Sequence, residues 1–456
     1  MPSPQERLFG TNGVRFQPGI SHDLDFVIKL SEAIGTYFGD GDLLVGRDGR
    51  LSSNALSYAT VSGLMSSGRN VGEAAGVVPT PAMQYAVKTQ GFRGGVMITA
   101  SHNPPEYNGL KVVGRDGVEI PRLDEQRIEK IFYDDAETRA DWRAVGVAME
   151  EPSVVKNYID GVLSKVNTKL IAKRNFSVVM DPGNGAQCVA APYLVESMGC
   201  KLITLNSVLD GNFPGRGPEP TPETLADLSA VVKSIGADLG VAYDGDGDRA
   251  IFCDEQGSIL WGDQSGCLLA DYVLERAPGG VLVTPVSSTQ AAEAIAKKRN
   301  ARVFRTRVGS VDVSRTIIER NATFGFEENG GCIYPPHISV RDGAMTTALM
   351  LECLAARGMS FSRAVSYWIP RFHQTKAKVE VDPGKVDLVM KKVERDTRGR
   401  VEKVDGLKFW LDERSWVLIR PSGTEPIMRV FAEAETREKA ESILKKFLKI
   451  VKAASA

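Results

Sequence analysis

The amino-acid sequence predicts an α/β protein made of three related α/β domains and a C-terminal α+β domain. A chain of 456 residues is too long for one hydrophobic core and is typical of three or four domains. Three segments repeat one pattern, in which a short apolar strand leads through a polar or glycine-containing turn into a helix-like stretch. Strands that alternate with helices are typical of parallel α/β layers. The C-terminal end differs, because several strands follow one another there.

The three repeated segments begin near residues 43, 176 and 281. They read "LLVGRDGRLSSNALSYATVSGLMSSG", "FSVVMDPGNGAQCVAAPYLVESMG" and "GGVLVTPVSSTQAAEAIAKKRNARVFRT". In the first segment an apolar face recurs at helical spacing: Leu56, Ala59, Gly63 and Leu64. Ser52 and Ser53 precede this face and are candidate helix caps. The pattern indicates one α/β module used three times.

The chain becomes strand-rich from about residue 368, with "KAKVEV", "LKFWLD", "SWVLIR" and "IMRVFAEA". The last segment, "TREKAESILKKFLKIVKAA", carries an apolar stripe at helical spacing: Ala440, Ile443, Leu444, Phe447, Leu448 and Val451. We expect this stripe to face the core of an α+β domain. Loops near residues 150, 254 and 368 predict domains of residues 1–150, 151–254, 255–367 and 368–456.

Composition favours a small ligand. The net charge of -1 and the pI near 6.5 provide no basic field for a nucleic acid or an anionic membrane. The start, "MPSPQERLFG", has no apolar signal core, and the sequence contains no stretch of about 18 apolar residues, so we expect a cytoplasmic protein. The six cysteines form no C-x-x-C pair, which favours reduced thiols over a zinc site or a disulfide framework.

The segment "VAYDGDGDRAIF" predicts a metal site. Asp244, Asp246 and Asp248 alternate with glycines, so their carboxylates share one side of an extended segment while the glycines let the backbone curl around an ion. Three hard oxygen donors without His or Cys suit Mg²⁺. A calcium-binding EF-hand is the alternative interpretation. It is disfavoured because Arg249 stands where that loop needs glycine and because the flanking segments resemble strands.

Two further segments offer polar groups to a sugar phosphate. In "RPSGTEP", Arg420 can form a fork to phosphate, the Ser422 and Thr424 hydroxyls can donate, and Gly423 allows the backbone to approach an anion. An ordinary hairpin turn has a similar composition. In "FGFEENGG", the carboxylate and amide groups can accept hydrogen bonds from sugar hydroxyls and donate to them, although a capped turn would have a similar sequence.

The segment "VMITASHNPPEYNGLK" places Ser101 beside His102 after an apolar strand. A Ser-His dyad for acyl transfer is disfavoured, because sequence neighbours rarely place the base on the nucleophile and no G-x-S-x-G elbow is present. A serine that carries a phosphoryl group, whose oxygens complete the Mg²⁺ shell of the three aspartates, would explain both motifs together.

"TASHNP", "DGDGDR", "FEENGG" and "RPSGTEP", in this order, resemble the motifs of the α-D-phosphohexomutase family, especially its archaeal-type members. The resemblance covers essentially the whole chain and implies four domains that each lend one motif to a central cleft. It further implies Mg²⁺-dependent interconversion of hexose 6-phosphate and hexose 1-phosphate through a phosphoserine and a hexose 1,6-bisphosphate. Overall likeness favours a phosphoglucosamine mutase, with a phosphomannomutase/phosphoglucomutase as the alternative. A Mg²⁺-dependent sugar phosphatase and a non-catalytic calcium-binding protein are more distant alternatives.

The resemblance also implies roles for residues of this sequence. Ser101 would be the phosphoserine and would bind Mg²⁺ together with the three aspartates. The catalytic candidates beside it are His102, Lys111, Arg15 and Arg249, with Lys111 as the general acid or base. The candidates for substrate binding are Glu327, Asn329, Gly309, Ser310, Arg420, Ser422, Gly423 and Thr424.

The sequence departs from the family pattern at three positions. Phe16 replaces a common glycine after Arg15, and Phe326 replaces the usual glycine before the sugar loop. Gly331 stands where many bacterial members carry histidine, which removes one proposed acid or base; His337 and Arg341 are candidate replacements. These changes leave the sugar preference open, and the sequence does not indicate an oligomeric state.

Overall fold

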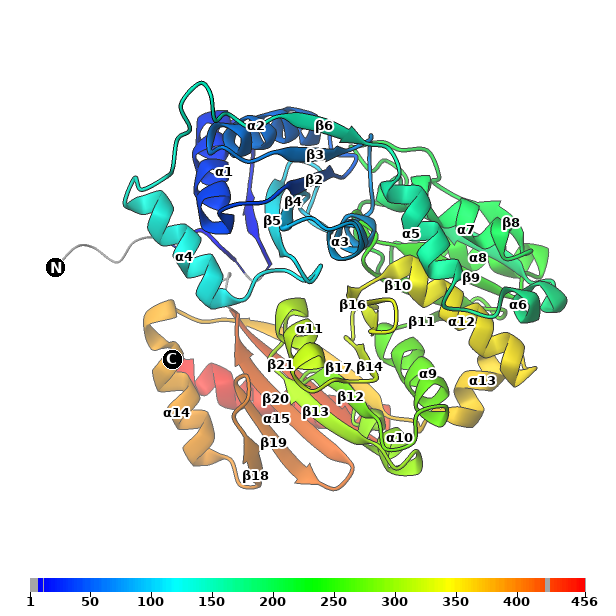
Figure 1. Cartoon of the computed structure of the whole chain (residues 1–456). Helices are drawn as coiled ribbons and strands as arrows, with labels where there is room; N and C mark the ends of the chain where they lie inside the picture. Colours follow the sequence, from blue (N-terminus) through cyan, green and yellow to red (C-terminus); the bar gives the residue numbers. More distant parts are fainter. Residues whose placement is uncertain (1–6, 11, 423–426, 456) are drawn as a thin grey trace. The chain divides into compact units, whose positions relative to one another are not determined.

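The computed structural model describes residues 7–10, 12–422 and 427–455 (Figure 1). The chain forms two compact units. The first unit holds the residues up to Ser265 together with Asn329–Ala364. The second unit holds Gly266–Glu328 and the chain from Val365 onward.

A six-stranded sheet opens the first unit, in the order β1-β5-β4-β2-β3-β6. Its strands are β1 (Val14–Phe16), β2 (Leu43–Arg47), β3 (Val71–Ala74), β4 (Gly94–Ile98), β5 (Asn108–Gly114) and β6 (Ala148–Glu151). Strands β2, β3, β4 and β6 are parallel, while β5 is antiparallel to β1 and β4. Strand β2 is buried on both faces, as expected of a parallel strand covered by helices.

Helices cover both faces of this sheet (Figure 1). They are α1 (Leu24–Phe38), α2 (Ser53–Ser66), α3 (Thr80–Thr89) and α4 (Arg122–Tyr133). Helices α1, α2 and α4 share one core cluster with Leu43 and Val45 of β2. Gly46 points to the opposite face, where an added Cβ would lie 2.9 Å from Met83 of α3. The helices leave the carboxyl ends of β2 and β4 available for polar groups, as is usual in α/β sheets.

The second sheet of this unit has the order β11-β10-β9-β7-β8. Its strands are β7 (Ser177–Asp181), β8 (Lys201–Thr204), β9 (Leu239–Tyr243), β10 (Ala250–Asp254) and β11 (Ile259–Leu260). The helices of this region are α5 (Val154–Leu163), α6 (Thr168–Arg174), η1 (Ala186–Val189), α7 (Ala191–Ser197) and α8 (Ala226–Ile235). Strands β7, β8 and β9 are parallel, and β9 forms an antiparallel hairpin with β10. This hairpin carries the three aspartates.

The remaining part of the first unit is the segment that returns to it after residue 328. There β15 (Cys332–Tyr334) pairs antiparallel with β16 (Ile338–Arg341). Helix α12 (Gly343–Arg357) follows and is buried along most of its length. Asp342 caps it by accepting a hydrogen bond of 2.9 Å from the backbone N–H of Met345. Helix α13 (Phe361–Trp368) comes next in the chain.

The second unit begins with a parallel layer, in which β12 (Val281–Pro285) pairs with β13 (Arg302–Thr306) and β14 (Phe324–Phe326). Helices α9 (Gly262–Glu275), α10 (Ala291–Lys298) and α11 (Ser310–Glu319) accompany it. An antiparallel sheet then has the order β17-β21-β20-β19-β18. Its elements are β17 (His373–Glu380), η2 (Pro383–Lys385), α14 (Val386–Asp396), β18 (Arg400–Glu402), β19 (Leu407–Asp412), β20 (Ser415–Pro421), β21 (Ile427–Ala434) and α15 (Arg437–Ser455).

These elements confirm the predicted fold class. Strands β2, β7 and β12 begin the three repeated segments, and the strand-rich end forms the α+β part. Five residues of the predicted helix stripe lie in the core cluster beneath the antiparallel sheet, and Leu448 packs against it. The capping prediction is correct in position for Ser52, which is the N-cap residue of α2, but its side chain makes no capping hydrogen bond, and the Ser53 hydroxyl donates to Asp48 at 2.6 Å. The domain boundaries at residues 150, 254 and 368 stay predictions.

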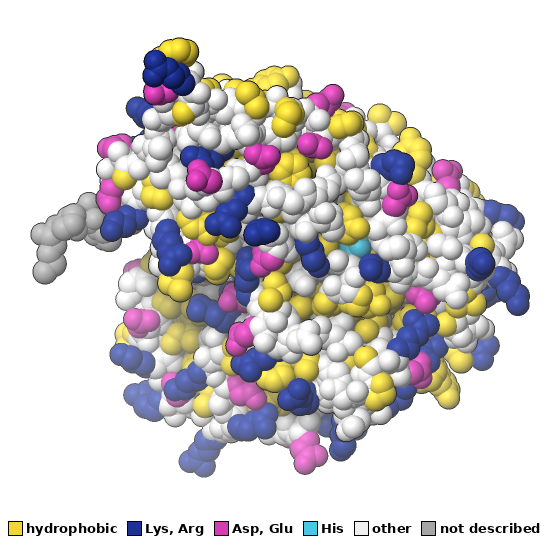
Figure 2. Space-filling view, in the orientation of Figure 1, with side chains coloured by type: hydrophobic (Ala, Val, Ile, Leu, Met, Phe, Trp, Pro, Cys, Tyr) yellow, Lys and Arg dark blue, Asp and Glu magenta, His cyan; other side chains and the backbone are white. Residues whose placement is uncertain are grey.

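The surface and the cysteines agree with the composition. On the face drawn in Figure 2, Lys and Arg side chains are interspersed with Asp and Glu. Every cysteine carries a free thiol. Among the described helices, none is long and apolar enough to cross a membrane.

A buried lysine gives the second unit a testable pH dependence. The Lys408 ammonium of β19 is buried, donates to the backbone carbonyl of Val286 at 2.9 Å and lies 3.9 Å from the ring centre of Trp416. Burial, followed by the charge of Arg305, lowers the pKa of Lys408 to about 7. Between pH 7 and the ordinary lysine value of about 10.4, the unfolded chain therefore binds one more proton than the folded chain.

We expect the free energy of unfolding of the wild type, relative to Lys408→Met, to rise from pH 7 to pH 10 by up to about 4 kcal/mol. Guanidinium unfolding at several pH values measures this difference. Lys445→Met, which removes an exposed lysine, should follow the wild type at every pH. A constant difference between wild type and Lys408→Met would contradict the prediction.

Candidate active site

Ser101 lies at the carboxyl end of β4 in a conformation that non-glycine residues rarely adopt. Its φ is 53° and its side chain is buried. The backbone N–H of Ser101 donates to Thr99 Oγ1 at 2.9 Å, and its carbonyl accepts from Arg50 at 2.7 Å. These bonds fix the left-handed backbone and aim the hydroxyl, whose Oγ donates to Asp244 Oδ2 at 3.0 Å.

The buried side chain of Arg50 clamps the serine loop. Its Nη atoms donate to four backbone carbonyls at distances of 2.7 to 2.9 Å: Ser101, Asn103, Pro104 and Tyr107. Its Nε donates to Asp48 Oδ2 at 3.1 Å, so all five N–H groups of the guanidinium are used. Sequence reasoning missed this pair, although both residues stand in the "GRDGR" turn that ends β2.

A second arginine holds the end of β9, where the aspartate loop begins. Arg216 Nε donates to Asp181 Oδ2 at 2.9 Å, at the end of β7. Its Nη2 donates to the carbonyl of Tyr243 at 2.6 Å, immediately before Asp244. Both loops are therefore held by a buried arginine that is itself paired with an aspartate at the end of a module's first strand.

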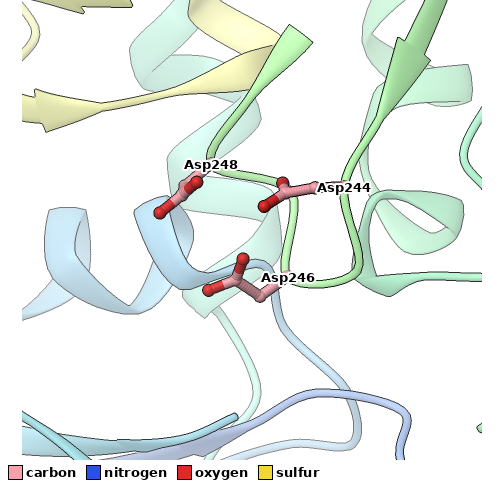
Figure 3. Close-up of side chains that lie close together, drawn as sticks. All are labelled: Asp244, Asp246 and Asp248. Carbon is pink, nitrogen blue, oxygen red and sulfur yellow. The ribbon is translucent and has the colours of Figure 1, made fainter. Parts of the chain in front are cut away.

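The three predicted metal ligands converge in the hairpin loop between β9 and β10 (Figure 3). Asp244, Asp246 and Asp248 are buried, and one ligand atom from each lies within 4.8 Å of the others. Strands flank this loop on both sides, whereas an EF-hand requires helices. The arrangement therefore disagrees with the calcium-loop alternative.

Two of these carboxylates accept hydrogen bonds at one oxygen and have no hydrogen-bond partner at the other, although Asp248 Oδ1 lies 3.7 Å from Arg249 Nε. Asp246 Oδ2 accepts from Lys111 Nζ and Thr80 Oγ1, both at 2.6 Å, and Asp248 Oδ2 accepts from Arg341 Nη2 at 2.5 Å. Within the described parts of the chain, the buried Oδ1 atoms of both aspartates have no hydrogen-bond partner. Unpartnered hard oxygens in a buried cluster are what a Mg²⁺ ion would satisfy, so the residues present fit this metal.

Burial and mutual repulsion perturb the carboxylates strongly. Burial, then the charges of Asp248 and Asp246, raise the pKa of Asp244 to about 8. Burial alone would also raise the pKa of Asp246, but the charge of the Lys111 ammonium and its hydrogen bond hold this pKa below its usual range. Burial lowers the pKa of Lys111, but the negative charges of Asp246 and Asp248 outweigh burial, so the pKa is raised overall. Lys111 therefore carries its proton at neutral pH.

The remaining catalytic candidates of the first unit lie at the same place. Arg15 of β1 contacts the Asn103 side chain, and burial lowers the pKa of Arg15 to about 10. Arg249 Nη2 donates to His102 Nδ1 at 3.0 Å, and Ser101 Oγ lies 3.5 Å from the same nitrogen. The Arg249 charge, then burial, hold the pKa of His102 far below its usual range. His102 is therefore neutral and accepts a hydrogen bond.

The two candidate replacements for the missing histidine have different surroundings. Arg341 reaches the aspartate cluster. His337 is buried elsewhere, with its ring stacked on Tyr85 at a centroid distance of 4.7 Å and its Nε2 3.3 Å from Asp342 Oδ2. Of the two, the structure brings Arg341 to the predicted site.

The substrate-binding candidates lie mostly in the second unit. Arg420 Nε donates to Asp405 Oδ2 at 2.8 Å, and the same oxygen accepts from the backbone N–H of Val308 at 3.0 Å. Ser422 N–H donates to the carbonyl of Ile427 at 2.9 Å, while Gly423 and Thr424 lie outside the described residues. Arg429, which sequence reasoning missed, is the direct partner of Arg420 in the ladder of β20 and β21.

The predicted sugar-binding residues Glu327 and Asn329 and the turn before α11 lie in the described part of the chain. Glu327 is buried, and burial raises the pKa of the adjacent Glu328. Asn329 belongs to the first unit, where its Oδ1 accepts from the N–H of Gly331 at 3.2 Å. Gly309 adopts a φ of 144° and precedes the buried Ser310 at the start of α11.

Comparison with known families assigns the chain. It matches four consecutive family models, described as phosphoglucomutase/phosphomannomutase alpha/beta/alpha domains I, II and III and the C-terminal domain. The matched residues are 6–139, 156–257, 261–372 and 377–450. The chain belongs to the phosphoglucomutase/phosphomannomutase family. The predicted membership of the α-D-phosphohexomutases is thereby confirmed.

Relatives of this phosphoglucomutase/phosphomannomutase family member are named as mutases. A phosphoglucosamine/phosphogalactosamine mutase of Sulfurisphaera tokodaii is 43% identical over 98% of this chain and 99% of its own length. A phosphoglucomutase/phosphomannomutase of Thermococcus kodakarensis is 41% identical over 98% and 99%. The crystal structure of a family protein from Burkholderia thailandensis superposes with a TM-score of 0.88 at 28% identity, covering 98% of this chain and 97% of that chain.

The two arginine clamps predict separate effects on two loops. Arg50→Lys replaces a rigid five-donor fork by one ammonium that cannot bridge four carbonyls, so backbone hydrogen exchange in residues 101–109 should accelerate by roughly tenfold. Arg216→Lys should instead accelerate exchange in residues 243–248. Hydrogen–deuterium exchange with mass spectrometry measures both segments in each variant. Equal acceleration of both segments in both variants would show a general loosening and contradict the assignment.

Proposed function

We propose that this family member interconverts hexose 6-phosphate and hexose 1-phosphate through a phosphoserine at Ser101 and a hexose 1,6-bisphosphate intermediate. The observation that carries this proposal is the hydrogen bond from Ser101 Oγ to Asp244 Oδ2, which joins a serine of strained backbone conformation to three carboxylates that could hold a metal ion. Glucosamine phosphate is the proposed main substrate, supported by the name of the Sulfurisphaera relative. Mannose and glucose phosphates are the alternative, supported by the name of the Thermococcus relative.

In the proposed reaction, the bond between phosphorus and Ser101 Oγ breaks while a bond forms between phosphorus and the free hydroxyl of the sugar. The hydroxyl proton leaves the sugar, and a proton ends on Ser101 Oγ. Lys111 enters each turnover as an ammonium, so it gives its proton to the leaving serine oxygen and takes one from the attacking hydroxyl. The intermediate then turns end over end, and Ser101 takes back the other phosphate.

The charged groups around Ser101 serve the anionic transition state. Mg²⁺, held by Asp244, Asp246, Asp248 and an oxygen of the phosphoserine, would supply positive charge beside the transferring phosphoryl group. Arg15 and Arg249 add fixed positive charge from the protein. His102 accepts from Arg249 and so orients that guanidinium.

The non-reacting phosphate is assigned to the second unit. Arg420 with Ser422, Gly423 and Thr424 would hold it through charge-assisted and backbone hydrogen bonds. Glu327 and Asn329 would form hydrogen bonds with the sugar hydroxyls, and Gly309 and Ser310 would make further contacts. The chain would comprise four domains with boundaries near residues 150, 254 and 368, and we expect a cytoplasmic location.

Two other classes would behave differently. A phosphatase would share the nucleophile and the metal but would release inorganic phosphate at the rate of turnover. A non-catalytic calcium-binding protein would carry no covalent phosphate. The mutase therefore requires both a phosphorylated serine and retention of phosphate on the sugar.

Ser101→Ala tests the nucleophile. The variant should fold normally and lose most turnover, because the proposal gives no other residue the phosphoryl group. Wild-type protein should carry a mass increment of about 80 Da on Ser101, and Ser101→Ala should lack it. Mutase assays with glucosamine, mannose and glucose 6-phosphates, together with intact-mass measurement, provide the readouts. Ser442→Ala removes an exposed serine and serves as the control; near wild-type activity in Ser101→Ala would refute the phosphoserine.

Arg420→Ala tests the distal phosphate site. One guanidinium should serve both orientations of the reorienting intermediate through hydrogen bonds of about 1.5 to 3 kcal/mol, so kcat/KM should fall by about tenfold to a few hundredfold in both directions. Escape of the 1,6-bisphosphate should increase. Steady-state kinetics in both directions and quantitation of free bisphosphate measure these effects, with Arg414→Ala on the preceding turn as the control. Loss of activity toward one substrate alone would mean that Arg420 reads a single orientation.

A further inference from the structure

Arg341, at the end of β16, is a third guanidinium at the phosphoryl site. Its side chain is buried, and Nη2 donates to Asp248 Oδ2 at 2.5 Å. Its charge contributes to lowering the pKa of Arg15 and of His102, as does the charge of Arg249. The three guanidiniums of Arg15, Arg249 and Arg341 therefore act on the same buried region.

The contact of Arg341 with Asp248 parallels that of Lys111 with Asp246. Each cation donates a hydrogen bond to the Oδ2 atom of one aspartate, and Lys111 also lies 3.6 Å from Asp248 Oδ2. In the described part of the chain, the Oδ1 atom of each aspartate is buried and has no hydrogen-bond partner, although Asp248 Oδ1 lies 3.7 Å from Arg249 Nε. Arg341 thus holds Asp248 in the orientation that presents Oδ1 to the cluster.

Gly331 allows the Arg341 side chain to reach this position. A Cβ added to Gly331 would lie 2.3 Å from Arg341 Cδ and 2.9 Å from its Cγ, while the next nearest atom, Asn329 Oδ1, is 3.3 Å away. The backbone of Gly331 lies outside the left-handed region, in contrast to Gly330 with a φ of 91°. Space for Arg341, rather than backbone conformation, therefore requires a glycine at this position.

We propose that Arg341 is a positioning residue of the phosphoryl-transfer site, which holds Asp248 and adds a third guanidinium to the aspartate cluster, and that residue 331 is glycine because the Arg341 side chain passes over it. This inference rests on the proposed function and deepens it. It also gives a role to the position where the sequence lacks the family histidine.

A double-mutant cycle of Gly331→Ala and Arg341→Ala tests the proposal. Arg341→Ala should lower kcat at saturating Mg²⁺ by about tenfold to a hundredfold, because an ion pair and a positive charge are both lost. Gly331→Ala should lower kcat in the wild-type background by displacing the Arg341 side chain. In the Arg341→Ala background, Gly331→Ala should not lower kcat further, because the two atoms nearest to the added Cβ, Arg341 Cδ and Cγ, are absent.

Binding of Mn²⁺, followed by electron paramagnetic resonance on the same full-length proteins, provides the second readout. Arg341→Ala should weaken Mn²⁺ binding, because Asp248 is no longer held, and kcat should stay low even at saturating metal, because a positive charge is lost as well. Recovery of the wild-type kcat at high metal concentration would show that the side chain only supports the aspartate loop and would contradict the role proposed for its charge. Arg341→Lys, which keeps the charge but not the fork, should have an intermediate kcat.

The controls separate this inference from the proposed function. Gly384→Ala, at a glycine whose added Cβ would meet nothing closer than 3.4 Å, should retain wild-type kinetics. If the losses in kcat of Gly331→Ala and Arg341→Ala multiply in the double variant, or if Arg341→Ala turns over at the wild-type rate, the inference is wrong. Inactive Ser101→Ala with a fully active Arg341→Ala would overturn the inference alone, whereas an active Ser101→Ala would overturn the proposed function.

Discussion

Three carboxylates are packed together in the buried loop between β9 and β10, and their repulsion is the constraint on which the first unit depends. Like charges at this separation in a medium of low polarity cannot all stay ionised without nearby cations. The chain supplies Lys111 from β5, Arg341 from β16 and Arg249 from the loop itself. Segments far apart in the sequence are therefore tied to one loop by charge, and the site is part of what holds these segments together.

The loop that carries Ser101 is held by hydrogen bonds to its backbone carbonyls. A left-handed, buried Ser101 is costly, and it is maintained by Arg50, which gathers the carbonyls of the loop around it. Arg216 holds the end of β9 before the aspartate loop, and in the second unit Arg305 donates to the carbonyl of Pro285, the last residue of β12, and to those of Ser288 and Thr289. Each of the three modules thus has an arginine beside the end of its first strand; Arg50 is buried, whereas Arg305 is half-buried. The repeated sequence pattern reflects this shared construction, although the residues that supply the arginine differ in position.

The motifs could be predicted from the sequence because each is local. Alternating Asp and Gly between two apolar runs defines the aspartate loop without any tertiary information, and Ser101 follows a strand that ends in polar residues. Arg50 could not be predicted, and Arg341 could be named only as one of two candidate replacements for the missing histidine, because their partners are distant. Arg50 binds backbone carbonyls, which have no signature in side-chain identity, and Arg341 meets an aspartate 93 residues away. The capping interpretation of Ser53 failed for a local reason, because the buried carboxylate of Asp48 accepts a hydrogen bond from its hydroxyl.

The charge balance of the cluster suits a phosphorylated serine. Lys111, Arg15, Arg249 and Arg341 oppose the three carboxylates, and two further carboxyl groups act on these cations: Glu219 lies 3.9 Å from Arg249, and Glu119 helps to raise the pKa of Lys111. The positive and negative charges therefore roughly offset one another before any divalent ion binds. A divalent cation on the aspartate oxygens would add positive charge, and a phosphoryl group, which carries close to two negative charges at neutral pH, would offset it. In the proposed function the Ser101 hydroxyl, directed at Asp244, would carry this group. The same cations would stabilise the phosphoryl group during transfer, because the charge that develops on the equatorial oxygens would meet groups that are already in place.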